Sequence, residues 1–417
     1  ELHTIDRTTL LNDAYFPTLP KKLNREQQAA YESIATSIDS GEFHTHLLHG
    51  VTGSGKTEVY LQLIQRAFKE DKSVILLVPE IALTAQTIER IKGRFQSGVA
   101  ILHYRLSEGE RLDAWNNIRD GNIKIVVGAR SAIFSPLPNL GLIIVDEEQD
   151  GSYKQTDEMP CYNARDLAIV RAKLTGCVAL LGSATPSLET YRNALDGKYH
   201  LNCLQSRASQ SSLPTVSIID MRLDREGSTN HRFFSETLLS KMRACVAKGE
   251  QVILFLNRRG TYSILKCEKC EHALECPHCD QTLTFHRSAQ HLSCHLCGYT
   301  LSPPPTICPS CHSGETIKFK GPGTDQIEHS LNAMFPDIRT LRMDGDTTRK
   351  KGAHDHLFKQ FRSGKADVLI GTQMIAKGLH FPSVTLVGVL NSYGALNIPD
   401  FRSFENVFQL ITQVSGR

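Results

Sequence analysis

Four Cys-x-x-Cys pairs lie close together in the second half of this 417-residue chain. They are Cys267/Cys270, Cys276/Cys279, Cys294/Cys297 and Cys308/Cys311. Two thiolates three residues apart on a tight turn can occupy neighbouring corners of a zinc tetrahedron, so the eight cysteines predict two zinc sites with four thiolates each. Disulfides are the alternative, but the regular pairing and the otherwise cytosolic character of the chain argue against them.

The lengths of the connections indicate which pairs share a metal. Five residues join Cys270 to Cys276, which is short for a hairpin between two metal-binding turns, whereas the spacing from Cys279 to Cys294 resembles that of a zinc ribbon. We therefore expect a nested arrangement. One zinc is held by Cys276, Cys279, Cys294 and Cys297, and the other by Cys267, Cys270, Cys308 and Cys311. Histidines of the segment are alternative ligands that the eight cysteines make unnecessary: His272, His278, His286, His291, His295 and His312.

The composition is that of an ordinary globular protein. A chain of 417 residues is too long for one core, and 40% hydrophobic with 22% charged residues is typical of globular proteins. The net charge of +3 is too small to indicate a nucleic-acid partner. The longest apolar runs, residues 74–78 and 142–145, are too short to span a membrane, and no signal peptide opens the sequence. We expect a cytoplasmic protein without membrane contact.

Short apolar runs alternate with helical patterns from about Leu47 to Leu195, which predicts a doubly wound parallel sheet. A second α/β pattern begins near Phe233. We expect a linker, a first lobe, a connection, a second lobe in two pieces and a cysteine-rich insertion. Their respective bounds are 1–20, 21–204, 205–232, 233–266 with 317–417, and 267–316.

The first apolar run ends in a phosphate-binding loop of the pattern G-x-x-x-x-G-K-[ST]. In such a loop the backbone N–H groups converge on the β-phosphate of a nucleotide, the lysine reaches the β- and γ-oxygens, and the hydroxyl residue ligates Mg²⁺. The sequence therefore predicts an ATP site with Mg²⁺. Its residues are Gly50, Thr52, Gly53, Ser54, Gly55, Lys56 and Thr57.

A later apolar run, residues 142–145, leads directly into Asp146 and Glu147. A strand at this place in a parallel sheet delivers both carboxylates to the edge where ligands bind. We expect Asp146 to hold Mg²⁺, directly or through water, and Glu147 to polarise the attacking water. A solvated acidic turn is the alternative, and the phosphate-binding loop makes it the weaker one.

Segments that follow apolar runs resemble, in order, motifs Ia, Ib, III, IV, V and VI of superfamily 2 helicases. They are residues 78–86, 128–134, 182–187, 252–260, 368–378 and 413–417. Hydroxyl groups, backbone amides and arginines at a sheet edge bind phosphates without reading bases. The expected DNA contacts, including two residues after the second acidic motif, are Thr84, Arg130, Ser131, Tyr153, Lys154, Arg258, Thr372 and Lys377. Upstream, Gln27 resembles an adenine contact, with the start of a surface helix as an equally weighted alternative.

Together these motifs resemble the PriA family of superfamily 2 replication-restart helicases over nearly the whole chain. Its specific marks here are the Asp-Glu-Glu box, residues 128–134, 152–155, 164–168, 371–378 and 399–402, and the eight cysteines. The resemblance implies two tandem RecA-like lobes with a four-cysteine zinc-ribbon-like insertion in the second. It also implies a 3′ to 5′ ATP-dependent DNA helicase that recognises stalled forks and initiates primosome assembly. Implied partners are forked or single-stranded DNA, single-strand-binding protein, and primosome and replicative-helicase-loading proteins.

The sequence departs from the family pattern at several positions. Gln149 stands where the family usually has His, and both can hydrogen-bond across the interface between the lobes. Cys161 and Asn163 stand where Arg and His are common, and His380 replaces an acidic residue. Tyr162 remains, with Tyr153 and Lys154, as a residue that could sense DNA by stacking and charge.

The chain opens at Glu1 without Met and ends at Arg417 inside motif VI, so we expect a fragment. Arg417 is the first arginine of that motif and an expected catalytic residue. The second, which the resemblance makes the arginine finger, is absent, as is the N-terminal DNA-binding region of the family. An arginine finger contributes about 10³ to 10⁵ in rate, so we expect ATP binding with weak hydrolysis.

The cysteine-rich insertion is acidic. Residues 267–318 carry three basic and five acidic side chains, and three minus five gives −2 before the metal sites add further negative charge. Tight binding to phosphates by this segment alone is therefore not expected. A strand-separating or DNA-guiding element, a protein-docking surface and a plain scaffold remain open. For the whole chain, a DNA-fork-binding platform whose ATPase only switches conformation is the alternative to a helicase.

Overall fold

The structure is a computed structural model of the chain. It describes residues 17–79, 85–95, 97–102, 106–156, 159–208, 214–221, 233–256, 265–270, 272–279, 281–286, 291–294, 296–319, 324–344, 347–348, 353–372, 375, 381, 383–390 and 400–416. The chain divides into two compact units, residues 1–214 and 215–415, with Gly416 assigned to the first and Arg417 to the second. No helix of the described residues is long and apolar enough to cross a membrane.

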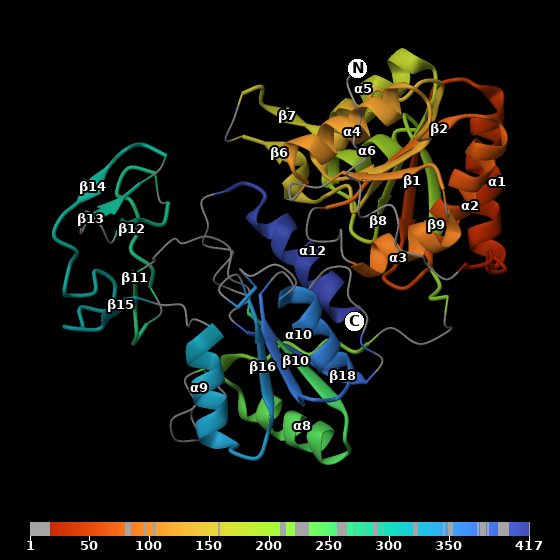
Figure 1. The fold of residues 1–417 in the computed structure, drawn as a ribbon. Coiled ribbons are helices and arrows are strands. Elements are labelled where there is room, and N and C mark those ends of the chain that lie inside the picture. The colour runs from red at the N-terminus through yellow and green to blue at the C-terminus, as the bar shows by residue number, and fades with distance from the viewer. Residues whose placement is uncertain are drawn as a thin grey trace. The chain divides into compact units, whose positions relative to one another are not determined.

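The first unit is built on a seven-stranded parallel sheet in the order β3-β4-β2-β5-β8-β1-β9 (Figure 1). Its strands are β1 (His44–Gly50), β2 (Ser73–Leu77), β3 (Val99–Leu102), β4 (Ile125–Gly128), β5 (Leu140–Asp146), β8 (Val178–Ser183) and β9 (His200–Leu204). All of these strands run parallel to one another. Loops that follow these strands therefore reach the ligand-binding edge of the sheet.

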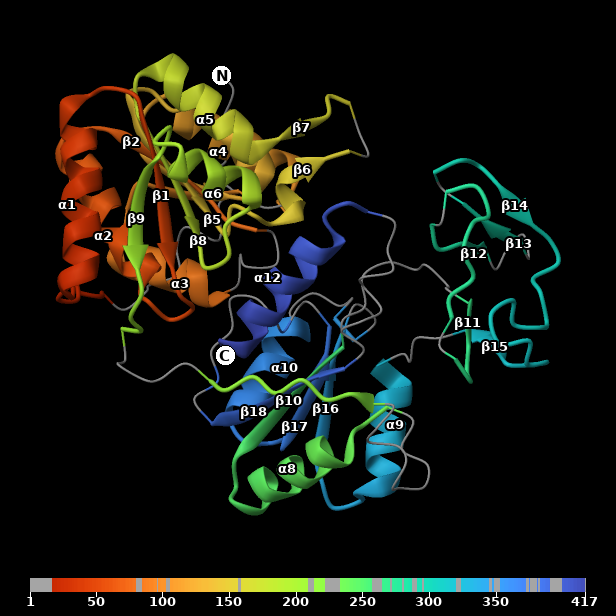
Figure 2. The ribbon, with the colours of Figure 1, turned by 180° about the vertical axis from the view of Figure 1, so that it is seen from behind.

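Helices cover both faces of this sheet, as the views from the front and from behind show (Figures 1 and 2). They are α1 (Arg25–Ser40), α2 (Lys56–Lys69), α3 (Ala85–Arg94), α4 (Glu108–Arg119), α5 (Ala164–Thr175) and α6 (Leu188–Leu195). The first unit also contains two short 3₁₀ helices, η3 (Arg130–Phe134) and η4 (Gly151–Tyr153). A two-stranded hairpin consists of β6 (Lys154–Gln155) and β7 (Tyr162–Asn163).

Successive side chains of the central strands enter different cores, because a strand points them alternately to its two faces. In β5, Leu142 and Ile144 pack in the core beneath α1, α2 and α3, while Ile143 and Val145 pack in the core beneath α4, α5 and α6. All four side chains are buried. This two-sided burial explains why the sequence shows continuous apolar runs instead of alternation.

The second unit holds a four-stranded parallel sheet in the order β16-β17-β10-β18. Its strands are β10 (Gln251–Leu256), β16 (Thr340–Met343), β17 (Val368–Gly371) and β18 (Val384–Leu390), and its helices are α8 (Glu236–Ala247), α9 (Thr324–Met334), α10 (Ala353–Arg362) and α12 (Ser403–Ser415). Side chains of α8 and α9 fill one core, and those of α10 and α12 fill the other. This unit is therefore again a sheet between two helical layers.

The cysteine-rich insertion leaves the second lobe after β10 and returns before α9. It contains an antiparallel pair, β11 (Leu265–Cys267) with β15 (Ile317–Phe319), and a three-stranded antiparallel sheet of β12 (Thr284–His286), β13 (His291–Ser293) and β14 (Thr300–Leu301). Its core consists of a few apolar side chains and the cysteines Cys276 and Cys294. The expected α/β fold, two RecA-like lobes with a cysteine-rich insertion in the second, is confirmed.

Burial predicts a clear contrast between two leucines of the first lobe. Leu180 in β8 is buried within the core, whereas Leu112 in α4 is 60% exposed. We expect Leu180→Ala to lower the free energy of unfolding of this lobe by about 2–5 kcal/mol, because it removes buried surface and leaves a cavity. Leu112→Ala, the matched control, should change it by less than about 0.5 kcal/mol. Urea unfolding followed by circular dichroism measures both, and equal effects would contradict the described packing.

Candidate nucleotide-binding and metal sites

The phosphate-binding loop joins β1 to α2. Gly55 caps the helix with φ +84°, a left-handed conformation that favours glycine. The Lys56 ammonium donates to the Gly50 carbonyl oxygen at 2.7 Å, so the lysine side chain folds back along the loop. The buried Ser54 hydroxyl has no hydrogen-bond partner among the described residues. A helix N-terminus, an ammonium group and an unused hydroxyl fit the phosphates of a nucleotide.

Gln27 braces this loop from α1. Its amide nitrogen donates to the Ser54 carbonyl oxygen at 2.7 Å, and its amide oxygen accepts the Asn24 N–H at 2.9 Å. The Asn24 side chain in turn accepts the N–H of Gln27, which completes a capping box at the start of α1. A Cβ at Gly55 would lie 2.4 Å from the Gln27 amide nitrogen, so the glycine makes room for this contact. Gln27 thus contacts the loop itself, and an adenine contact stays a prediction.

Asp146 ends β5 and is held from two sides by buried phenols. The Tyr60 hydroxyl of α2 donates to Asp146 Oδ1 at 3.0 Å, and the Tyr153 hydroxyl donates to the Asp146 carbonyl oxygen at 2.6 Å. Burial, together with the neighbouring Glu147 charge, raises the pKa of Asp146 to about 6, and the Lys56 ammonium opposes this rise. The carboxylate is therefore costly to ionise without a cation nearby, as suits a Mg²⁺ ligand.

Glu147 adopts a positive φ of 49° directly after the strand. Its carboxylate accepts the Gln149 amide N–H at 2.7 Å, and the Gln149 oxygen accepts the Ser183 hydroxyl at 2.6 Å. The Ser183 hydroxyl oxygen also accepts the N–H of Thr185 at 2.8 Å. Gln149 thus links the acidic motif to the motif after β8, and these bonds lie within the first lobe.

Glu148, the third acid of the box, is buried away from solvent. Its carboxylate accepts the Ser187 N–H at 2.6 Å, the Thr190 hydroxyl at 2.9 Å and the Arg165 guanidinium at 3.2 Å. Burial raises the pKa of Glu148, and the Arg165 charge opposes that rise. These bonds tie the acidic motif to α5 and α6, so Glu148 has a structural role that the sequence did not single out.

A partly exposed cluster of aromatic and basic side chains lies on η3 and the β6–β7 hairpin. The Phe134 ring is 50% exposed and packs edge-on against Tyr162, with ring centroids 5.1 Å apart. Arg130 donates to the Lys154 carbonyl oxygen at 3.4 Å, and the Lys154 side chain is exposed. We call Arg130, Phe134, Lys154 and Tyr162 the aromatic-basic patch. Phe134 was not among the expected DNA contacts, although it stands within the motif of residues 128–134.

The other expected DNA contacts differ in their exposure and in whether the structure describes them. Ser131 is exposed on η3, and Thr372 directly follows β17. Tyr153 differs from the expectation of a ring that stacks on DNA: it is only 1% exposed, because its hydroxyl is directed inward to Asp146. Four expected site residues lie outside the described residues: Thr84, Arg258, Lys377 and Arg417.

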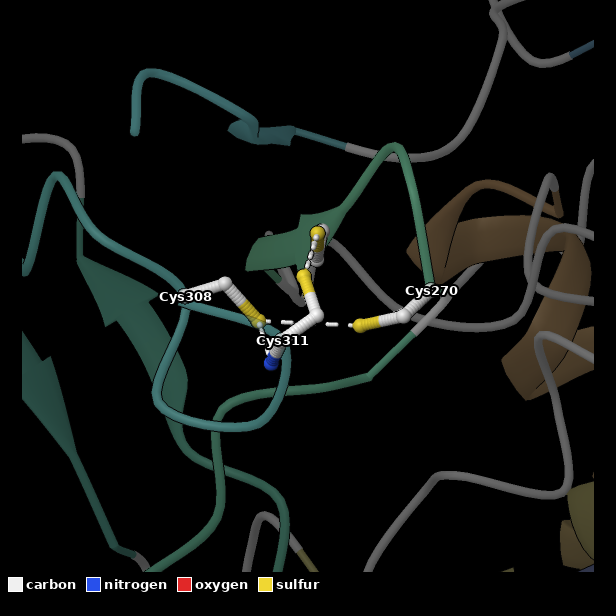
Figure 3. Close-up of side chains that lie close together, drawn as sticks. Cys270, Cys308 and Cys311 are labelled. Carbon is white, nitrogen blue, oxygen red and sulfur yellow. Dashed lines mark hydrogen bonds between the residues drawn. The ribbon is translucent and has the colours of Figure 1, made fainter. Parts of the chain in front are cut away.

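The eight cysteines form two groups of four, and both groups follow the nested order. One comprises Cys267, Cys270, Cys308 and Cys311, and the other comprises Cys276, Cys279, Cys294 and Cys297. Within each group the sulfur atoms lie within 4.8 Å of one another. Figure 3 shows the sulfur atoms of Cys270 and Cys308 facing each other, with Cys311 beside Cys308.

The sulfur spacing fits zinc and excludes disulfides. Facing sulfur atoms are 3.6 Å apart for Cys270 and Cys308, and 3.3 Å apart for Cys279 and Cys294. A disulfide requires about 2.05 Å. In a tetrahedral site with Zn–S bonds of about 2.3 Å, the sulfur atoms lie about 3.8 Å apart, close to the observed distances. Each group consists of cysteines alone among the described residues, without the alternative histidine ligands.

The four metal-binding turns repeat one backbone pattern. In each, the N–H of the first cysteine donates to the carbonyl oxygen five residues later. The pairs are Cys267 to His272 (2.9 Å), Cys276 to Gln281 (2.7 Å), Cys294 to Tyr299 (2.8 Å) and Cys308 to Ser313 (3.0 Å). Each turn is also closed by pairing between residues seven apart: Lys266/Ala273, Glu275/Thr282, Ser293/Thr300 and Ile307/Gly314. The insertion is therefore four copies of one short turn arranged as two pairs.

Hydrogen bonds lower the pKa of at least one cysteine in each group and so favour its thiolate form. The Thr316 hydroxyl, 3.2 Å from Cys267 Sγ, lowers the pKa of that thiol to about 6. The backbone N–H of Cys297 lowers the pKa of Cys294 to about 6 in the same way. Zinc binds cysteine as the thiolate, so these bonds favour metal binding.

Comparisons with known proteins agree with this geometry. Family models match as "DEAD/DEAH box helicase" over residues 24–194, "PriA DNA helicase Cys-rich region (CRR) domain" over 276–301 and "Helicase conserved C-terminal domain" over 308–417. The "Replication restart protein PriA" of Chlamydia pneumoniae is 52% identical over 403 residues, which are 97% of this chain and 54% of that protein. The chain belongs to the PriA family. The protein of the same description from Bacillus subtilis (strain 168) is 52% identical over 96% of this chain and 49% of its own length.

The chain spans about half the length of these PriA relatives. Among solved structures, "Structure of RecG bound to three-way DNA junction" matches 94% of this chain and 45% of that chain, with a TM-score of 0.50 and 17% identity. This likeness supports the fold alone. The PriA cysteine-rich model covers the inner group of cysteines, while Cys267 and Cys270 of the outer group precede it and Cys308 and Cys311 follow it.

Zinc content tests the nested order. Double substitution Cys276→Ser/Cys294→Ser removes two ligands of one group, so we expect zinc to fall from two ions per chain to one. Cys267→Ser/Cys276→Ser damages both groups and should leave none. Inductively coupled plasma mass spectrometry of the purified chain measures this, with Cys203→Ser, an exposed cysteine outside both groups, as the control. One zinc retained by Cys267→Ser/Cys276→Ser would contradict the nested order.

Proposed function

We propose that this chain is the motor part of an ATP-dependent DNA helicase that acts in replication restart. One observation carries the proposal: the helix α2, which begins in the phosphate-binding loop after β1, is joined to the acidic motif at the end of β5 by the bond from Tyr60 to Asp146. Both segments follow parallel strands of the same sheet, with β8 between them. The site therefore has the two halves that a phosphoryl-transfer motor needs.

The residues of the site divide the chemistry among them. Lys56 would exchange its bond to the Gly50 carbonyl for the β- and γ-phosphates of ATP, and backbone N–H groups of the loop would also bind these phosphates. Thr57 and Asp146 would hold Mg²⁺, and that ion would neutralise charge on the transferred phosphoryl group. Glu147 would orient the attacking water, while the Gln149 amide fixes the Glu147 carboxylate. The positive charge of Arg417 would stabilise negative charge on the γ-phosphate.

DNA is proposed to contact the first lobe at the aromatic-basic patch. The exposed Lys154 ammonium and the Arg130 guanidinium would bind backbone phosphates, and the Phe134 and Tyr162 rings would stack on bases. Such contacts do not depend on base sequence. Ser131 and Thr84 of the first unit, and Arg258, Thr372 and Lys377 of the second, are further proposed DNA contacts.

The cysteine-rich insertion would guide or part strands instead of binding phosphates tightly. Its charge of three minus five, or −2, opposes a phosphate-binding role. Two zinc ions would fix its turns, since the described core contains few apolar side chains. Unwinding and partner binding by the Cys276→Ser/Cys294→Ser variant would distinguish this role from the alternatives. Loss of partner binding alone would indicate a docking surface, and retention of both activities would indicate a plain scaffold.

The relatives' description as replication restart proteins supports a role at stalled forks. We therefore propose 3′ to 5′ translocation, recognition of forked or single-stranded DNA and initiation of primosome assembly. Proposed partners are single-strand-binding protein and the proteins that load the replicative helicase. The proposed divisions are a linker at 1–20, lobe 1 at 21–204, a connection at 205–232, lobe 2 at 233–266 and 317–417, and the insertion at 267–316.

Strand displacement on fork DNA by the full-length protein tests this function. We expect ATP-dependent unwinding that Lys56→Ala abolishes, because the substitution removes the ammonium group that would bind the phosphates. The control is Lys69→Ala, an exposed lysine at the other end of α2. If forks were bound and partners recruited without any ATP-dependent unwinding, the protein would instead be an assembly platform whose ATPase switches its conformation.

The aromatic-basic patch is tested by binding to single-stranded DNA. We expect Phe134→Ala to weaken binding by about 1–3 kcal/mol, because the base loses a ring on which to stack. Arg130→Ala should reduce the slope of log affinity against log salt concentration by about 1, because one phosphate contact is lost. Phe68→Ala is the aromatic control, since Phe68 is 41% exposed on α2 and outside the patch. Fluorescence anisotropy over a salt series measures all three, and unchanged affinity in Phe134→Ala would remove the patch from the DNA path.

A further inference from the structure

Tyr60 is a buried phenol next to the acidic motif that none of the recognised motifs includes. It lies in α2, four residues after Lys56 and therefore about one helical turn along. Only 2% of its surface is exposed, yet its side chain carries a polar group. That hydroxyl donates to Asp146 Oδ1 at 3.0 Å, so the buried polar group is satisfied by a carboxylate expected to hold Mg²⁺.

The contact depends on a glycine in the neighbouring strand. Asp146 in β5 and Gly182 in β8 are cross-strand partners in the sheet. A Cβ at Gly182 would lie 1.6 Å from the Tyr60 hydroxyl oxygen, which is far inside any allowed contact. Because Gly182 has no side chain, the phenol reaches over β8 to the carboxylate at the end of β5. The sheet therefore provides a dedicated space for the hydroxyl.

A second buried phenol bonds the same residue at a different atom. Tyr153 donates to the main-chain carbonyl oxygen of Asp146 at 2.6 Å, so it fixes the backbone but not the carboxylate. Tyr153 and Tyr60 are both almost fully buried. The two phenols therefore allow the effect of a bond to the carboxylate to be separated from the effect of a buried hydroxyl as such.

We propose that Tyr60 is a positioning residue for the magnesium site, whose hydroxyl fixes the orientation of the Asp146 carboxylate beside the phosphate-binding loop. The inference rests on the proposed ATP-dependent function. Tyr60 need not touch nucleotide or metal. It acts as an outer partner of a metal ligand, and loss of such a partner typically weakens metal affinity by about 10–100-fold.

The test is the Mg²⁺ dependence of nucleotide binding by the full 417-residue chain, followed with a fluorescent ATP analogue. We expect Tyr60→Phe to raise the half-saturating Mg²⁺ concentration about tenfold. Binding of the analogue in EDTA should not change, because the loop contacts to phosphate remain. The matched control Tyr153→Phe removes the other buried hydroxyl that bonds Asp146, at its main-chain carbonyl oxygen. It should lower the melting temperature of the protein but leave the Mg²⁺ dependence of nucleotide binding unchanged.

A double-mutant cycle makes the assignment independent of general packing. In an Asp146→Ala background, Tyr60→Phe should have no further effect on the Mg²⁺ dependence, because the carboxylate on which it acts is gone. Two results would overturn this inference but leave the proposed function intact. One is an equal shift of the half-saturating Mg²⁺ concentration in Tyr60→Phe and Tyr153→Phe, and the other is a wild-type Mg²⁺ dependence in Tyr60→Phe. If the unsubstituted chain bound the analogue without any Mg²⁺ dependence, the proposed function would fall and the inference with it.

Discussion

The parallel direction of the strands in the first lobe is the constraint on which the site depends. Every strand of this sheet ends at the same edge, so each segment that follows a strand is brought to one line of loops. Tyr60 and Gly182 are 122 residues apart in the chain (182 minus 60). Tyr60 nevertheless donates a hydrogen bond to Asp146, and Asp146 is the cross-strand partner of Gly182. The chemistry is thus a consequence of strand direction.

Three consecutive acids at the end of β5 receive three different environments. Asp146 is bonded by a phenol, Glu147 by the amide of Gln149, and Glu148 by Arg165 and two hydroxyl residues. Glu148 has a cationic partner in Arg165, whose guanidinium lies 3.2 Å from its carboxylate. This division explains how one short run can supply both a reactive edge and a fixed connection to α5 and α6. Identical residue types act differently because burial and partners differ.

Much of the fold and of the cysteine groups could be predicted from sequence, because both depend on local signals. Buried parallel strands leave continuous apolar runs, and the short Cys270–Cys276 connection indicates the nested order. Tyr60 and Phe134 were missed because their importance depends on neighbours far away in the chain. The burial of Tyr153 was missed for the same reason. In the sequence an aromatic residue beside a lysine suggests an exposed DNA contact, and only the structure shows that the Tyr153 hydroxyl bonds the Asp146 carbonyl oxygen.

The nested order of the cysteines also links the entropic cost of the outer site to that of the inner one. Cys279 and Cys294 of the inner group are 15 residues apart in sequence, whereas Cys270 and Cys308 of the outer group are 38 apart. Closing a chain loop costs more entropy as the loop lengthens, and the inner loop lies wholly within the outer one. Once the inner four thiolates have bound their ion, the outer loop has already lost much of its freedom. With the inner ion bound, the outer site would therefore be completed at a reduced entropic cost.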